Sequence, residues 1–246
     1  MDLLQQITHC PNVQTCLENK PDNHPCSKIV VVQQVTKLAD FQVPEPWSGY
    51  ITQAPILFLS SNPSISDSEF YPTWDWSEAE LDKFFTARFE QYIKNGNQAL
   101  QQDKQTYSKA VKFWSAVRGR AKELLEREVI PGKDYVLSEV VHCKSQGETG
   151  VKEASFECAS RYPRPILELA KARVIVVLGR QAKEAVKLQF GLTQTSASIV
   201  KPTFGGCLRY LVFLPHPNAF SPKSFSNCLT EVELRELKTF LHQTKP

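Results

Sequence analysis

Continuous apolar runs, bounded by proline or glycine, are the feature that most constrains the fold of this chain. Residues 56–59 and 174–178 contain no polar side chain, and residues 208–214, after the pair Gly205-Gly206, are mainly apolar with one charged residue, Arg209. Runs of this length are typical of parallel strands that are buried on both faces. With residues 134–143 as another strand, the sequence predicts a three-layer α/β/α domain around a central, mainly parallel, four-stranded sheet.

Helix signals lie between these strands. Ser77 with Glu80, and Thr230 with Glu233, have the spacing of a capping box. We expect helices over residues 77–94, 106–128, 152–170 and 180–186, and from Thr230 onwards. The predicted organisation is a single domain, 1–246, with an irregular cysteine-containing segment at 1–50, an α/β core at 54–243 and a hairpin within 196–214.

Composition narrows the class of protein. The chain has 246 residues, of which 41% are hydrophobic, so it can bury a sizeable core and is not disordered throughout. No apolar run approaches the ~20 residues of a membrane span, and the N-terminus lacks the pattern of a signal peptide. We therefore expect a cytoplasmic protein without membrane contact. The net charge of +3 does not by itself indicate nucleic-acid binding.

Polar residues follow the predicted strands where each strand ends. Asn62-Pro63-Ser64 comes after the first strand, Glu139 lies near the end of the second, and His216-Pro217-Asn218 follows the last. In open parallel sheets, ligands bind beyond the carboxyl ends of the strands. These residues are therefore candidates for one site.

Two of these loops resemble loops of DNA glycosylases. Asn62-Pro-Ser resembles the Asn-Pro-Gly loop of mismatch-specific and thymine-DNA glycosylases, and His216-Pro-Asn resembles the His-Pro-Ser loop of the uracil-DNA glycosylase superfamily. Residues 138–144 with Cys158, and residues 174–182, resemble the iron–sulfur branch. The resemblance covers residues 54–243. It implies a monofunctional, monomeric DNA glycosylase that flips a pyrimidine base out of double- or single-stranded DNA and hydrolyses its N-glycosidic bond.

The resemblance also implies roles for individual residues. Asn62 would position the attacking water, and His216 would donate a hydrogen bond to the departing base. Asp67 is either a carboxylate that assists the water or a surface residue. Tyr71 or Phe70 would stack on the base, Phe220 would fill the gap that the base leaves, and Lys223, Ser224 and Arg180 would contact phosphates. The alternative is that residues 70–76 and Phe220 belong to the core.

Seven cysteines are many for a cytoplasmic protein, where disulfides are not expected. The resemblance implies that Cys143, Cys158 and two of Cys10, Cys16 and Cys26 hold a structural [4Fe–4S] cluster; four thiolates also suit zinc, and unrelated thiols are a further alternative. The family's Cys-x-x-Cys spacing is absent, so the N-terminal pair stays open. Cys207 and Cys228 are interpreted as structural.

Glu139 departs from the family pattern. Four residues before the cluster cysteine, the family has an asparagine that reads uracil, and here the residue is a glutamate. An ionised carboxylate only accepts hydrogen bonds, so it favours the N4 amino group of cytosine over O4 of uracil unless it is protonated or points away. Another possibility is that Glu139 bridges to Lys144 or to an arginine.

Ordinary cytosine cannot be the target, because its excision would destroy the host genome. The sequence therefore suggests a modified cytosine, such as glucosylated hydroxymethylcytosine of phage DNA, and a role in antiviral defence. The alternatives are a uracil-DNA glycosylase of base-excision repair, a non-catalytic DNA-binding relative, and a nucleoside hydrolase of another α/β family.

Overall fold

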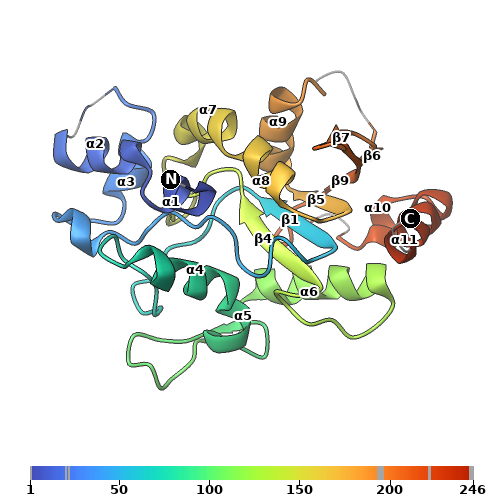
Figure 1. Cartoon of the computed structure of the whole chain (residues 1–246), viewed down its shortest axis with the longest axis horizontal. Coiled ribbons are helices and arrows are strands. Elements are labelled where there is room, and N and C mark those ends of the chain that lie inside the picture. The colour runs from blue at the N-terminus through green and yellow to red at the C-terminus, as the bar shows by residue number, and fades with distance from the viewer. Residues whose placement is uncertain (1, 20, 22, 193–196, 221–222, 244–246) are drawn as a thin grey trace.

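A mainly parallel sheet forms the centre of the molecule (Figure 1). The structure, a computed structural model, describes residues 2–19, 21, 23–192, 197–220 and 223–243. The sheet has the strand order β4-β1-β5-β9-β6. Its strands are β1 (Ile56–Ser60), β4 (Tyr135–Glu139), β5 (Val174–Leu178), β9 (Tyr210–Leu214) and β6 (Ile199–Val200). The first four are parallel, as predicted, and β6 adds a fifth strand that runs antiparallel to β9.

Helices cover both faces of this sheet. They are α1 (Leu3–Thr8), α2 (Pro11–Asn19), α3 (Ser27–Val31), α4 (Glu78–Thr86), α5 (Arg88–Gln91), α6 (Lys112–Leu125), α7 (Val151–Arg161), α8 (Pro163–Leu169), α9 (Arg180–Gln189), α10 (Phe225–Cys228) and α11 (Glu231–His242), with a short 3₁₀ helix at Leu38–Asp40. Figure 1 shows α7, α8 and α9 on one side of the sheet and α6 on the other. Within the described residues, no helix is both long and apolar enough to cross a membrane.

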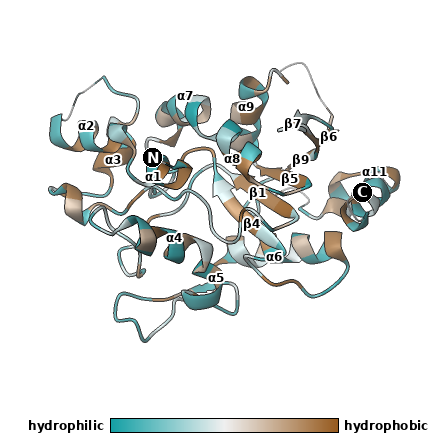
Figure 2. Ribbon diagram, viewed as in Figure 1, coloured by the Kyte–Doolittle hydropathy of each residue, from teal (hydrophilic) through white to brown (hydrophobic). Residues whose placement is uncertain are grey.

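The core is divided by the sheet into two layers. The four parallel strands are buried at every position, which explains their continuous apolar sequences, and in Figure 2 they carry much of the brown, hydrophobic colouring. Successive side chains of a strand point to opposite faces. Leu57, Leu59, Ile175 and Val177 pack with the N-terminal helices, α4 and α7–α9, whereas Ile56, Phe58, Val174 and Val176 pack with α6 and α11.

The N-terminal segment holds, in its described residues, three short helices up to Val31, so the prediction of an irregular segment over residues 1–50 was wrong for that part, whereas residues 32–50 contain only the 3₁₀ helix. Its short helices bury apolar residues in the same core layer as α7: Leu4, Ile7, Val13, Leu17, Ile29 and Val30. The backbones of α3 and α7 approach so closely that a Cβ on Gly150, just before α7, would lie 2.4 Å from the backbone nitrogen of Ile29. The segment therefore packs on the domain through its own side chains. Its helices are too short to show a clear helical period in the sequence.

The segment between α4 and α6 also differs from the prediction. The capping box at Ser77 is present, but the helix ends at Thr86, and α6 begins only at Lys112. Between them, β2 (Ile93–Lys94) pairs with β3 (Gln98–Ala99) around a turn in which Asn95 and Gly96 have φ values of 55° and 70°. The backbone of residues 93–111 bonds to itself, for example from Val111 N to Asn97 O at 2.7 Å. These pairings satisfy the backbone without a helix.

The remaining predicted elements differ mainly in their boundaries. The predicted helix over 152–170 is broken into α7 and α8 at Pro163, which is the first residue of α8. The predicted hairpin appears as β7 (Thr203–Phe204) and β8 (Cys207–Leu208), which pair around Gly205-Gly206; residue 196 lies outside the described residues. The capping box at Thr230 starts α11, as expected.

Candidate active site

A cavity of about 320 Å³ lies beyond the carboxyl ends of β1, β4 and β9. Asn62, Glu139 and His216 all line it, so the structure brings together the three residues that the sequence placed at strand ends. We call these three residues the strand-end wall. The cavity is also lined by residues from α5, from the segment before α6 and from the start of α6, including Arg88, Gln101, Ser108, Phe113 and Trp114.

The loop after β1 holds Asn62 in place. It continues the pairing of β1 with β4 beyond the strands, because Ser145 N donates to Pro63 O at 3.0 Å and Ile65 N donates to Ser145 O at 3.1 Å. The Asn62 side-chain amide donates to Pro63 O at 3.0 Å, and its Oδ1 accepts from the Ser61 hydroxyl at 3.4 Å. A carbonyl oxygen has two lone pairs, so Oδ1 can also accept a hydrogen bond from a water.

The His216 ring is set up as a neutral donor. Asn218 N donates to His216 Nδ1 at 3.2 Å, so in the neutral ring the proton is on Nε2. Burial lowers the pKa of His216 and outweighs the opposite effect of Glu148. The ring stacks on Phe113, with 5.5 Å between centroids and 25° between planes. Gly179, with φ of 88°, leaves room for this residue, because a Cβ there would lie 3.1 Å from His216 Cβ.

Glu139 is buried at the end of β4, with 6% of its surface exposed. Burial raises the pKa of this carboxyl well above its ordinary value, the neighbouring carboxylate of Glu45 adds to the rise, and a hydrogen bond from Ser60 opposes it. Its Oε2 is buried without a hydrogen-bond partner. An ionised Glu139 would disfavour uracil, whereas a protonated Glu139 would not. Burial favours the protonated form. The expected bridge from Lys144 is absent, because Lys144 pairs with Glu69 instead.

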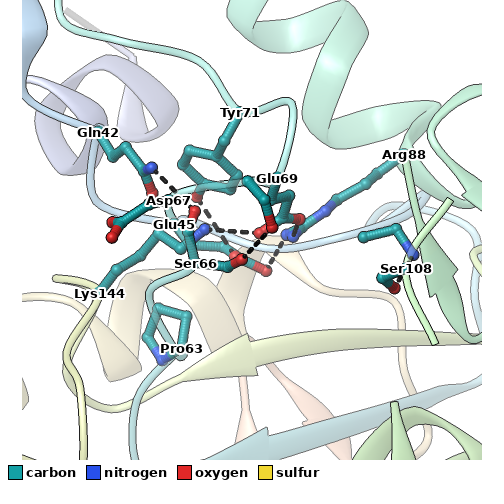
Figure 3. A network of polar contacts seen from close by, with 12 residues as sticks. Gln42, Glu45, Pro63, Ser66, Asp67, Glu69, Tyr71, Arg88, Ser108 and Lys144 are labelled. Carbon is teal, nitrogen blue, oxygen red and sulfur yellow. Dashed lines mark hydrogen bonds and ion pairs between the residues drawn. The ribbon is translucent and has the colours of Figure 1, made fainter. Parts of the chain in front are cut away.

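Four charged residues form a network beside this wall, and we call Glu45, Glu69, Arg88 and Lys144 the charged wall (Figure 3). The guanidinium of Arg88 contacts Glu45 Oε1 at 2.5 Å through Nη1 and Glu69 Oε1 at 2.8 Å through Nη2. Lys144 Nζ donates to Glu69 Oε2 at 2.9 Å. Two carboxylates therefore face two cations, and three of the four residues line the cavity.

Ion pairing keeps Glu69 and Arg88 ionised although both side chains are buried. Burial acts to raise the pKa of Glu69, but Lys144 and Arg88 outweigh it and lower the pKa to about 2. Burial likewise acts to lower the pKa of Arg88, and Glu45 and Glu69 raise it instead. Sequence reasoning missed this network, because its members are far apart in the chain and carry no motif. The local sequence signal for this network is weak, namely charged residues that stand beside apolar runs.

The aromatic residues predicted to stack on the base lie outside the cavity lining. Tyr71 is buried in the charged wall: its hydroxyl donates to Glu45 Oε2 at 3.3 Å, and Lys144 Nζ lies 3.4 Å from its ring centroid. Phe70 stacks on Tyr92, at 5.7 Å between centroids. The aromatic rings that line the cavity belong to Phe113 and Trp114, which sequence reasoning either passed over or assigned to a helix face in the core.

The predicted carboxylate at Asp67 is also outside the cavity. The residue is exposed, and Figure 3 shows its side chain pointing away from Arg88. This is the surface position that the sequence left as an alternative. The carboxylates that line the cavity are those of Glu45, Glu69, Glu139 and Glu148.

The predicted DNA contacts surround the loop after β9. Phe220 is fully exposed, so the alternative that it belongs to the core is wrong. Lys223 is exposed, and the hydroxyl of Ser224 accepts from Asn227 N at 3.2 Å as the cap of α10. The Arg180 side chain is 88% exposed at the start of α9, 3.7 Å from Glu184.

The five predicted cluster cysteines are all buried, whereas Cys207 is exposed and Cys228 partly buried. Burial raises the pKa of the Cys143 thiol, and Cys158, Cys10, Cys26 and Cys16 raise it further. Such mutual effects require the thiols to be close together. Cys16 Sγ also lies 3.3 Å from His24 Nδ1. Among the described residues, no three His, Cys, Asp or Glu side chains are arranged to hold a metal ion.

The donor chemistry of this cysteine group nevertheless fits thiolate ligation. Cys10 lies between α1 and α2, and Cys26 directly precedes α3, whereas Cys143 and Cys158 come from the loop after β4 and from α7, so the group joins two parts of the chain. Buried thiols with raised pKa values are protonated at neutral pH, and a bound metal would deprotonate them.

No protein-family model and no curated protein sequence matches this chain.

Proposed function

We propose that this protein is a monofunctional DNA glycosylase that excises a pyrimidine base and leaves an abasic site. The observation that supports this most strongly is that Asn62, Glu139 and His216, which follow or end three different strands, line one cavity. The cavity offers an amide oxygen, a buried carboxyl group and a neutral imidazole N–H. These groups match the requirements of N-glycosidic bond hydrolysis.

The proposed chemistry follows from the charges that develop as the bond breaks. The sugar becomes positive and the departing base negative, so a donor aimed at the base oxygen stabilises the transition state. His216 Nε2–H serves as this donor. Because the ring is neutral, it forms no ion pair before the reaction and donates to the base oxygen as negative charge develops there. Asn62 Oδ1 accepts a hydrogen bond from the water that attacks the sugar. The sugar cation needs little nucleophilic assistance, which suits an amide.

The substrate we propose is a modified cytosine, such as glucosylated hydroxymethylcytosine of phage DNA, in an antiviral role. Glu139 can accept a hydrogen bond from N4 of cytosine in either protonation state. The alternative, a uracil-DNA glycosylase of base-excision repair, is favoured by the burial of Glu139, because a protonated carboxyl group can also donate to O4 of uracil. A cavity of about 320 Å³ with polar walls leaves room for a ring substituent.

Extrusion of the base from duplex DNA is proposed to use the loop after β9. Phe220, which is fully exposed in that loop, would enter the space that the extruded base leaves. Lys223, Ser224 and Arg180 are placed to contact phosphates. Phe113 or Trp114, rather than Tyr71 or Phe70, would then stack on the base within the cavity. We propose that the protein acts as a monomer.

The cysteine group is proposed to hold a structural [4Fe–4S] cluster, with zinc as the alternative. Cys143 and Cys158 would supply two ligands and the N-terminal segment the other two, from Cys10, Cys16 and Cys26. Protein purified without oxygen should absorb broadly near roughly 400 nm through iron–thiolate charge transfer. Cys143→Ser should abolish this absorbance, whereas Cys207→Ser, at an exposed thiol, is the matched control. A colourless protein with one bound zinc would replace the cluster but keep the ligands.

The experiment that tests the function uses a panel of oligonucleotides of one sequence. Each carries cytosine, a modified cytosine, uracil or thymine at the same position, and the released bases are identified by mass spectrometry. We expect release of a modified cytosine, or of uracil, with an abasic site in the remaining strand. DNA binding without release of any base would instead indicate a non-catalytic relative, and release from free nucleosides alone would indicate a nucleoside hydrolase.

A further inference from the structure

Glu139 stands apart from the other buried carboxylates of the cavity. Glu45 and Glu69 each contact Arg88, and Glu69 also contacts Lys144. Glu139 is similarly buried, at 6% exposure, yet among the residues that the structure describes no cation forms an ion pair with it and its Oε2 has no hydrogen-bond partner. A buried polar atom without a partner is rare in folded proteins and calls for a ligand or a neutral state.

The groups that face Glu139 come from three neighbouring elements. Ser60 on β1 bonds to it, Glu45 from the segment before β1 places a second carboxylate beside it, and Arg88 on α5 is the nearest cation. Arg88, however, donates through Nη1 to Glu45 and Ser48 and through Nη2 to Glu69, so its charge is already balanced. Burial and the Glu45 carboxylate therefore both disfavour a negative charge on Glu139.

We propose that Glu139 reads the extruded base as a neutral carboxylic acid, donating one hydrogen bond and accepting another. This inference deepens, and rests on, the proposed glycosylase function. From the sequence, Glu139 was interpreted as an ionised carboxylate that only accepts hydrogen bonds unless it is protonated. A neutral Glu139 also donates one.

A neutral carboxylic acid can pair with two kinds of base edge. Toward a cytosine edge, its O–H donates to N3 and its carbonyl oxygen accepts from the N4 amino group. Toward a uracil edge, the carbonyl oxygen accepts from N3–H and the O–H donates to O4. An ionised carboxylate has no proton to donate, so it leaves N3 of cytosine or O4 of uracil without a donor. Glu139 therefore admits both edges, and the choice between substrates falls to contacts with the ring substituent.

The protonation state can be measured without any catalytic activity. Infrared spectra of the whole wild-type protein and of Glu139→Gln are recorded at neutral pH, and their difference is taken. We expect the carbonyl stretch of a protonated carboxylic acid in the wild type and its loss in the variant. Glu148→Gln, which removes an exposed carboxylate from the cavity rim, is the matched control and should retain the band. A carboxylate band lost in Glu139→Gln would overturn the proposal.

Catalysis provides the second readout. The kcat/KM values for a uracil-type base and for a cytosine-type base with the same 5-substituent are followed with pH in the wild type and in Glu139→Gln. In the wild type we expect both values to fall relative to the variant, by about tenfold per pH unit once Glu139 ionises, because both edges accept the donated proton, at O4 of uracil or at N3 of cytosine. Glu139→Gln should show no such fall, since an amide does not ionise. A ratio of wild-type to variant kcat/KM that stays constant across the range in which the infrared band disappears would contradict the proposal.

The two tests separate this inference from the proposed function. If no base is released from any DNA, the glycosylase function fails, while the infrared band still reports whether Glu139 is neutral. If bases are released but the band belongs to a carboxylate, the function stands and the reading mode is wrong.

Discussion

The cavity has two walls that are built from similar side chains but treated differently by the fold. In the charged wall, Glu69 is paired with both Arg88 and Lys144, and its pKa is lowered to about 2. In the strand-end wall, Glu139 has no cation partner, and its pKa is raised. Both carboxyl groups are buried. Burial alone therefore does not decide the charge of a carboxyl group here; the presence of a committed cation does.

This difference indicates a division of tasks. Buried charges that are already paired with one another fix the shape of a cavity and have less to offer a ligand, although Arg88 Nε has no hydrogen-bond partner among the described residues. Groups that keep an unused donor or acceptor, such as Glu139 and the Nε2–H of His216, reduce stability and are available for binding or chemistry. We therefore expect substitutions in the charged wall to affect folding, and those in the strand-end wall to affect base release.

The largest effect is expected from Arg88→Met in the charged wall. The substitution leaves Glu45 buried without its cation, and removal of one partner from a buried pair costs about 3–5 kcal/mol. Urea unfolding followed by circular dichroism measures this loss. Arg127→Met is the control, since its pair with Asp134 is partly exposed and should contribute about 1 kcal/mol or less. An equal loss in both variants would remove the distinction between the two walls.

The next effect is on chemistry in the strand-end wall. Asn62→Ala and His216→Ala should each lower the rate of base release by ~100-fold or more, the scale for loss of a transition-state donor or a positioned water. The free energy of unfolding should change by no more than ~1 kcal/mol, because both side chains make few contacts within the protein. Single-turnover base release and urea unfolding are measured on the same samples. Wild-type turnover in both variants would show that the active site lies elsewhere.

Glu139→Gln should stabilise the protein in a pH-dependent way. The folded-state pKa of Glu139 is raised above the unfolded value of about 4.3, so its contribution to stability is intact below that pH and is lost as pH rises toward the folded pKa. Glutamine does not ionise, so the variant does not lose this stability. The difference in free energy of unfolding between the variant and the wild type should grow by about 1.4 kcal/mol for each pH unit in that window.

Glu69→Gln provides the opposite sign for the same measurement. The pKa of Glu69 is lowered to about 2, so its stabilising charge is present above about pH 4.3 and is lost as pH falls toward 2. Thermal unfolding between pH 2 and pH 7 compares the two variants. Parallel pH dependences would mean that Glu139 and Glu69 are in equivalent environments.

The smallest effect is expected from Phe113→Leu, which removes the ring that stacks on His216. Aromatic stacking contributes about 0.5–1.5 kcal/mol beyond burial, so base release should slow by about tenfold or less through a less well-oriented imidazole. The pH profile of kcat should shift as well, because a looser ring is less desolvated and its pKa moves back toward the ordinary value. Phe156→Leu on the exposed face of α7 is the control. A change confined to KM would assign Phe113 to base stacking instead.

The sequence by itself determined the central sheet and the position of the site along the chain. Val174–Leu178 and its counterparts are apolar at every position because both faces of a parallel strand are buried, so the signal is local and strong. Asn62 and His216 directly follow such strands, and parallel strands end at the same edge of a sheet. Their meeting in one cavity was therefore predictable from chain order alone.

Tertiary structure alone decided the N-terminal helices, the turn around Asn95 and Gly96, and the charged wall. The short helices at Leu3–Thr8 and Ser27–Val31 contain too few turns to show a period, and their stability comes from packing on α7. Glu45, Glu69, Arg88 and Lys144 meet only when the chain is folded. The charge of Glu139 depends on that meeting, because Glu45 and Glu69 take up the available cations and leave Glu139 without one.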